Sequence, residues 1–105
     1  MNFIDAKVLS SNNKNYEVSF LDSLKIKIEK KEKFFLDGEL AILGIRPEHL
    51  TVNNKMGNNW EGKVFVVEKL GSGTFLYLEN KNEPIVVQTD GDTKIKTGDT
   101  IGIGF

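Results

Sequence analysis

The sequence contains no cysteine, only two prolines and a single histidine among its 105 residues. Without cysteine the chain can form neither a disulfide framework nor a thiol nucleophile, and this fits a reducing compartment such as the cytoplasm. One histidine leaves few general bases, and no Ser-His-acid arrangement can be recognised. The sequence therefore predicts that the chain is not an enzyme.

Long apolar runs are also missing. No stretch of about 18 apolar residues is present, as a membrane-spanning helix would require. The N-terminal segment MNFIDAKV lacks the basic and apolar regions of a signal peptide. We therefore expect a chain that does not insert itself into a membrane.

Neither sign of charge is in excess. Lysine and arginine together number 14 and aspartate and glutamate 15, which gives a formal net charge of −1. The chain has no strong field to attract nucleic acid or an anionic membrane, so we expect no nucleic-acid partner. At this length we expect one domain, residues 1–105, with a single hydrophobic core.

Apolar and polar residues alternate with a period of two through most of the chain. This pattern is typical of half-buried strands, and the expected strands are bounded by Gly, Asn, Asp or Pro. They are Phe3 to Val8, Tyr16 to Phe20, Leu24 to Ile28, Trp60 to Leu70, Thr74 to Glu79, Ile85 to Thr89 and Thr100 to Phe105. Only the segment Glu29 to Phe34 suggests a short helical turn, so the chain is predicted to be mainly β.

Two segments, Leu40 to Ile45 and Val64 to Val67, are apolar on both faces. Open antiparallel sheets rarely tolerate this without a cover on each side. Closure into a small barrel would supply that cover. We therefore expect both faces of these two segments to be buried.

An internal repeat supports the barrel. The segment Lys96 to Phe105 matches Leu36 to Ile45 at an offset of 60, and Glu61 to Val64 matches Asp5 to Val8 at an offset of 56. The sequence thus predicts an all-β, OB-fold-like barrel built from two similar strand repeats. The repeats cover about residues 3–46 and 60–105, joined by a segment 46–59. The alternative is two unrelated β-meanders with the same turn requirements.

The segment LGIRPEHL (43–50) holds the only arginine and the only histidine of the chain. Pro47 cannot donate to a strand ladder and favours an extended Arg46, so the strand should end here. Pro47 and Glu48 suit the first turn of a short helix, and Leu50 can fold back on the core.

Two interpretations of the RPEH residues remain open. In one, Arg46 pairs with a carboxylate at the barrel rim, Glu48 caps the turn and His49 packs at the edge. In the other, the turn is a contact surface. Arginine in place of lysine indicates a bidentate partner, so Arg46→Lys should be more harmful than the conserved charge suggests.

Three further features have ordinary structural explanations. LGSGT (70–74) lacks the lysine and spacing of a phosphate loop, so a glycine-rich hairpin turn is favoured. QTDGDTK (88–94) has no closing glutamate for a calcium loop, so we expect a solvated turn and no metal site. Trp60, Phe65, Phe75 and Tyr77 could stack on single-stranded nucleic acid, but their alternation with aliphatic residues favours the core.

Taken together, LGIRPEHL, GKVFVVEKLGSGTFLYLE (62–79) and KTGDTIGIGF (96–105) carry a family resemblance. The chain resembles the C-terminal accessory region of sugar-type ABC importer ATP-binding subunits, the maltose and glycerol-phosphate group, with its TOBE-type OB fold. The resemblance spans essentially the whole chain. Its most specific element is Gly44 to His49, reinforced by V-V-E-x-L-G-S at Val66 to Ser72.

This resemblance implies a non-catalytic regulatory and dimer-contact domain of an ATP-binding subunit. It places an interface motif at Arg46, Pro47, Glu48 and His49, with secondary positions Glu68, Gly71 and Ser72. The phosphate-binding loop and signature motif of the ATPase are missing, so no cofactor is expected in this chain. ATP and Mg²⁺ would be bound by the nucleotide-binding domain of a parent subunit.

The partners that the resemblance implies are a second copy of the subunit, the adjoining ATPase domain, the membrane subunits and, in some members, a regulatory protein. The location would be the cytoplasm, at the inner face of the cell membrane. Two other functions remain as alternatives. One is an OB module that binds an oxyanion or small sugar near Arg46 and His49, and the other is a nucleic-acid-binding OB domain using Trp60, Phe75 and Tyr77.

Overall fold

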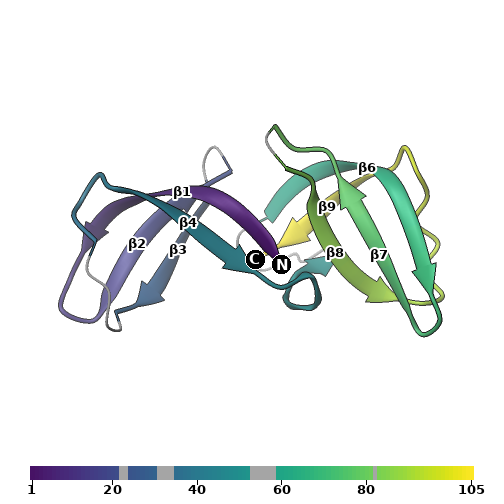
Figure 1. Cartoon of the computed structure of the whole chain (residues 1–105), viewed down its shortest axis with the longest axis horizontal. Coiled ribbons are helices and arrows are strands. Elements are labelled where there is room, and N and C mark those ends of the chain that lie inside the picture. The colour runs from purple at the N-terminus through teal and green to yellow at the C-terminus, as the bar shows by residue number, and fades with distance from the viewer. Residues whose placement is uncertain (22–23, 31–34, 53–58, 82) are drawn as a thin grey trace. The chain divides into compact units, whose positions relative to one another are not determined.

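The computed structural model describes residues 1–21, 24–30, 35–52, 59–81 and 83–105. This part of the chain forms strands, shown in Figure 1, and one short 3₁₀ turn, η1. The strands are β1 (Asn2–Ser11), β2 (Asn15–Phe20), β3 (Leu24–Glu29), β4 (Leu40–Ile45), β5 (Thr51–Val52), β6 (Asn59–Leu70), β7 (Gly73–Leu78), β8 (Ile85–Asp90) and β9 (Thr100–Gly104). The mainly β prediction is confirmed, while the turn suggested at Glu29 to Phe34 falls largely outside the described residues.

The strands form two antiparallel sheets in two compact units. The first sheet has the order β3-β2-β1-β4 and the second the order β5-β9-β6-β7-β8. One unit, called the N-terminal unit below, is Ile4–Leu43, and the other, the C-terminal unit, consists of Met1–Phe3 and Gly44–Phe105. β1 and β2 are joined by residues 12–14 and β6 and β7 by Gly71 and Ser72, short polar connections of the kind that the period-two pattern with intervening turn residues predicts.

The C-terminal unit is a nearly closed barrel. Inward residues alternate along its strands, so that on β7 Thr74, Leu76 and Leu78 are buried while the residues between them are half-buried. β5 pairs with β9 and also contacts β8, the strand at the opposite end of the sheet. The sheet therefore curls until its ends meet. Its most deeply buried aliphatic side chains are Val64, Leu76, Leu78, Ile85, Val87 and Ile103.

The N-terminal unit buries one face of its sheet. Its core side chains are Ile4, Ala6, Val8, Tyr16, Val18, Phe20 and Leu24. The expectation that Leu40 to Ile45 would be covered on both faces is wrong, because Leu40 is 79% and Ile42 69% exposed. β4 is an edge strand whose side chains alternate, so Ala41, Leu43 and Ile45 are half-buried while the residues between them are exposed.

The same expectation is also wrong for Val64 to Val67. Val64 is buried, but Phe65 and Val66 are exposed. A β-bulge lies between Val64 and Val66 in the pairing of β6 with β7. The extra residue of a bulge bends the strand and leaves side chains outside the ladder, which explains why an apolar run here does not stay in the core.

Two backbone hydrogen bonds fix the last strand of each repeat, β4 in the N-terminal unit and β9 in the C-terminal unit. In the N-terminal unit the Val8 N–H donates to the Glu39 carbonyl (2.9 Å), and the Gly38 N–H donates to the Val8 carbonyl (2.6 Å). The Glu39 carboxylate accepts a further bond from the Leu36 N–H (2.8 Å). Gly38 has φ +84°, a conformation that glycine adopts without strain.

The C-terminal unit repeats this arrangement. The Val64 N–H donates to the Asp99 carbonyl (2.8 Å), and the Gly98 N–H donates to the Val64 carbonyl (2.7 Å). The Asp99 carboxylate accepts from the Lys96 N–H (2.9 Å), and Gly98 has φ +98°. The sequence offsets of 56 and 60 thus correspond to equivalent hydrogen bonds.

Strand order and irregularities repeat as well. β4-β1-β2-β3 corresponds to β9-β6-β7-β8. The bulge between Val8 and Ser10 in β1 has its equivalent between Val64 and Val66 in β6. The prediction of two similar strand repeats is confirmed, and the limits given to them, 3–46 and 60–105, remain a prediction.

Gly62 on β6 has no room for a side chain. A Cβ built there would lie 2.7 Å from the Trp60 ring and 2.8 Å from Leu78. We expect Gly62→Ala to lower the free energy of unfolding by about 1–3 kcal/mol, since overpacking forces neighbours off their rotamers. Denaturant unfolding measures this change.

Gly102 provides the matched control, because it faces β6 in the same strand pair and a Cβ there meets nothing within 4 Å. Gly102→Ala should leave stability unchanged or raise it by up to about 1 kcal/mol. Equal destabilisation by both substitutions would contradict the crowding at Gly62.

Candidate functional site

The RPEH segment lies directly after β4. Arg46 has extended backbone angles (φ −75°, ψ 143°), and Pro47 begins the 3₁₀ turn η1, which spans Pro47–His49. The His49 N–H donates to the Arg46 carbonyl (3.0 Å). The predicted end of the strand and the predicted short turn are both confirmed, for the reason that proline suits the first position of a turn.

The side chains of the turn face solvent. Arg46, Glu48 and His49 are exposed and Pro47 is half-buried. His49 is thus not buried at the barrel edge, and Arg46 makes no side-chain hydrogen bond that caps the turn. The choice between an edge-packed turn and a contact surface stays a prediction. This arrangement leaves a cation, a carboxylate and an imidazole accessible on four consecutive residues.

The residues after the turn hold it against the barrel. Leu50 is only 3% exposed, and Thr51 and Val52 pair with Gly104 and Ile103 of β9. The turn itself contacts β8. The folding back of Leu50 on the core is thus confirmed, and it fixes an otherwise exposed turn to the scaffold.

The secondary positions lie on the β6–β7 hairpin. Glu68 is exposed on β6 opposite Phe75, while Gly71 (φ +59°) and Ser72 form the exposed turn. A Cβ built at Gly91 would lie 3.0 Å from the carbonyl oxygens of Gly71 and Ser72. LGSGT is therefore a hairpin turn, as predicted, packed against the backbone that follows β8.

The two groups of predicted residues do not meet. In Figure 1 the η1 turn is the short coil that follows β4, whereas the β6–β7 hairpin lies at the lower right, at the opposite end of the C-terminal unit. The sequence motifs therefore mark two separate surface features of the C-terminal unit, and not one site.

The aromatic residues divide between the two faces of the sheet. The Trp60 ring lies over Gly62 beside Leu78 on the core side, as expected. For Phe75 and Tyr77 the core interpretation is wrong, because they lie on the face opposite Leu76, and Tyr77 contacts the exposed Phe65 with its ring edge (centroids 6.5 Å apart). Period-two alternation identifies the face of a residue relative to its neighbours but does not say which face is inside.

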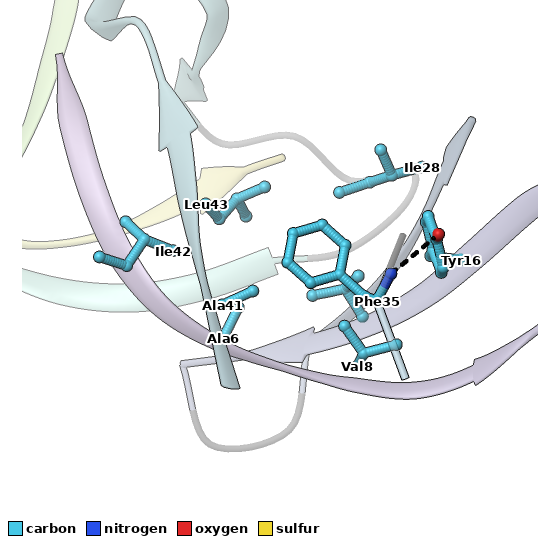
Figure 2. Close-up of a pocket in the computed structure, with 9 residues that line it drawn as sticks. Ala6, Val8, Tyr16, Ile28, Phe35, Ala41, Ile42 and Leu43 are labelled. Carbon is cyan, nitrogen blue, oxygen red and sulfur yellow. Dashed lines mark hydrogen bonds between the residues drawn. The ribbon is translucent and has the colours of Figure 1, made fainter. Parts of the chain in front are cut away.

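An apolar hollow in the N-terminal unit was not predicted. Figure 2 shows its lining residues, and its volume is about 80 Å³. They are Ala6, Val8, Tyr16, Val18, Ile28, Phe35, Ala41, Ile42 and Leu43. The Tyr16 hydroxyl accepts a hydrogen bond from the Phe35 N–H (3.0 Å), and the two rings meet edge to face with centroids 5.6 Å apart.

The chemistry of the described residues is limited. Within the described ranges no group of three or more His, Cys, Asp or Glu side chains is placed to hold a metal ion. The same residues contain no helix long and apolar enough to cross a membrane. What the structure offers is a small β-barrel module with exposed polar turns and exposed apolar strand residues.

This class of module, an OB-type barrel with an internal strand repeat, agrees with the family comparisons. The family model for the TOBE domain matches residues 43–105, and the model for the MalK OB fold domain matches residues 1–50. The chain belongs to the TOBE domain family.

Curated relatives are ATP-binding proteins of importers. Over 70 residues, 65% of this chain, it is 44% identical to the maltose/maltodextrin import ATP-binding protein MalK of Vibrio cholerae, of which it covers 19%. Over 96% of its length it is 31% identical to the alpha-glucoside transport ATP-binding protein AglK of Rhizobium meliloti, covering 28%. The sn-glycerol-3-phosphate import ATP-binding protein UgpC of Cupriavidus metallidurans is 38% identical over 62% of the chain, which covers 18% of that protein. The chain therefore spans less than a third of these relatives.

Leu50 should be the residue that stabilises the RPEH turn. Leu50→Ala removes a buried side chain and is expected to lower the free energy of unfolding by about 2–5 kcal/mol. Glu48→Ala, two residues away and exposed, should change it by no more than about 0.5 kcal/mol. Thermal and denaturant unfolding of both variants measure the difference, and a neutral Leu50→Ala would contradict the anchoring role.

Proposed function

We propose that this chain is a non-catalytic regulatory and dimer-contact domain of the ATP-binding subunit of an ABC importer for sugars or related polyols. The family membership supports the type of domain, and the names of the relatives support the type of importer. The chain matches the TOBE and OB regions of such proteins, so the ATPase chemistry would belong to the rest of the parent subunit.

The observation that carries the contact role is the exposure of large apolar side chains on strands. Leu40 and Ile42 project from β4 of the N-terminal unit, and Met1 and Phe3 are each 60% exposed in the C-terminal unit. Fully burying one such side chain contributes about 1.5–3 kcal/mol. A second copy of the subunit that covers them would gain this free energy, and linked ATPase domains would add effective concentration.

The RPEH turn supports the regulatory part of the proposal. Its backbone is fixed by η1 and by buried Leu50, so Arg46 and Glu48 are presented from a rigid base. A planar guanidinium recognises a carboxylate with two parallel hydrogen bonds, which a lysine cannot reproduce. The adjoining ATPase domain or a regulatory protein would supply that carboxylate.

The remaining properties follow from a parent subunit of this kind. This chain would bind no cofactor, and ATP and Mg²⁺ would be held by the parent's nucleotide-binding domain. Its other partners would be the membrane subunits of the transporter. The domain would then act in the cytoplasm at the inner face of the cell membrane.

Self-association tests the contact role. Sedimentation velocity of the chain, followed to millimolar concentration, should show a weak dimer that Ile42→Lys abolishes, because a buried lysine leaves an unpaired charge. Leu70→Lys is the matched control, since Leu70 is also exposed but lies at the β6–β7 hairpin. A dimer lost equally with both variants, or a monomer throughout, would contradict the assigned surface.

In the parent subunit, deletion of residues 1–105 should weaken nucleotide-free dimerisation.

Arg46 distinguishes a partner contact from an internal one. Because its side chain is exposed, Arg46→Lys should leave the melting temperature of the isolated chain unchanged but reduce transport in the intact system, since lysine cannot make the paired contact. Glu48→Gln provides a second variant on the same turn. Unchanged transport with Arg46→Lys would contradict a bidentate contact at this position.

A further inference from the structure

The two repeats differ at one place, the gap between their outer strands. In the C-terminal unit this gap lies between β8 and β9, and the chain fills it with Leu50 to Val52. Leu50 is buried in the core, and the two residues after it form β5 on the open edge of β9. The occupant is thus one aliphatic side chain followed by a short extended backbone.

The equivalent gap in the N-terminal unit lies between β3 and β4. Here the sheet order β3-β2-β1-β4 ends at β4, and in the described part of the chain no strand pairs with its outer edge. The apolar hollow of Figure 2 is located at this gap, with Ile28 contributed by β3 and Ala41 and Leu43 by β4. Among its described residues the repeat therefore has the place for an occupant but no segment equivalent to Leu50 to Val52.

We propose that this hollow and the free edge of β4 together bind an extended segment of another protein. The segment adds a short strand to β4, and one of its aliphatic side chains enters the hollow. Strand addition of this kind gains main-chain hydrogen bonds from the exposed edge and specificity from the side-chain pocket. The C-terminal unit supplies the template, because Leu50 to Val52 occupies the same place there.

The size and polarity of the hollow select the side chain. Its volume is about 80 Å³ and its lining is apolar, whereas a dry cavity of about 150 Å³ is what binds a benzene ring. A branched aliphatic residue therefore fits and an aromatic ring does not. The exposed Leu40 and Ile42 extend the apolar surface on the strand that the segment would pair with.

The charge at the mouth of the hollow selects the neighbouring residue of the segment. The ammonium group of Lys30 lies 4.9 Å above the ring of Tyr16, which lines the hollow. An acidic residue close to the aliphatic one would complement this cation, as in the chain's own segment, where Glu48 precedes Leu50 by two positions.

A peptide copied from residues 44–52, GIRPEHLTV, is the probe for this site. Added to the ¹⁵N-labelled chain, it should shift the amide signals of Ala41, Leu43 and Ile28, with a dissociation constant of about 1 mM, because little remains after the cost of association. The same peptide with aspartate in place of leucine should not bind. Shifts confined to β8 and β9 would mean exchange with the resident Leu50 segment and would overturn the proposal, as would no shift at all.

Variants of the chain locate the binding. Ala41→Phe fills the hollow and should abolish the shifts, while Ser19→Phe places the same ring on the opposite face of the sheet and should leave them unchanged. Lys30→Glu, which does not alter the hollow, should weaken binding of the peptide several-fold and favour a peptide carrying lysine in place of glutamate. Equal binding by wild type, Ala41→Phe and Lys30→Glu would overturn the proposal.

The dimer proposed above is tested separately. Lys30→Glu and Ser19→Phe both keep Ile42, the residue to which the dimer contact is assigned. Sedimentation of these two variants without peptide therefore measures self-association alone. Loss of peptide binding with an intact dimer, or the reverse, therefore identifies which of the two proposals fails.

Discussion

The repeated pair of hydrogen bonds between a valine and a glycine-acid turn determines where the last strand of each repeat, β4 or β9, lies. Val8 binds Glu39 and Gly38, and Val64 binds Asp99 and Gly98, with nearly equal distances. Each bond uses the backbone, so the arrangement tolerates different side chains as long as the glycine can hold a positive φ and the acid can accept the bond from the turn. Once β4 and β9 are fixed in this way, the alternation of apolar residues decides which side chains enter each core.

The connection between the repeats gives the two units different properties. After β4 the chain cannot continue as a strand, because Pro47 lacks the N–H group that a ladder needs. It turns and buries Leu50 in the C-terminal unit, where the following residues pair with β9. The same step that closes one barrel exposes the Arg46, Glu48 and His49 side chains and leaves the gap beside β4 without an occupant in the described chain. The closure of the C-terminal barrel and the accessibility of the RPEH side chains thus both result from this one short segment.

Much of this architecture was predictable from local sequence patterns. Period-two alternation located the strands, the spacing of Gly38 and Gly98 revealed the repeat, and Pro47 marked the end of β4. The burial of individual faces was not predictable, since β4 and the middle of β6 are apolar on both sides and periodicity does not say which side meets the core. The hollow was missed because Phe35 lies outside any periodic segment. Separation of the RPEH turn from Gly71 and Ser72 required the three-dimensional path of the chain.

The distribution of polar and apolar surface accounts for the contact role that we propose for this module. Exposed charged groups lie on both strands and turns, where they are hydrated and cost little to maintain in the free chain, and such groups contribute specificity more than affinity. Most of the large exposed apolar side chains of the described residues are on strands, where a sheet edge can also offer unpaired backbone groups. An exposed edge beside apolar side chains carries a risk of non-specific pairing, and β4 combines both. A partner that covers β4 would remove that risk in the assembled protein, which gives a physical reason for such a strand in a domain with the contact role that we propose.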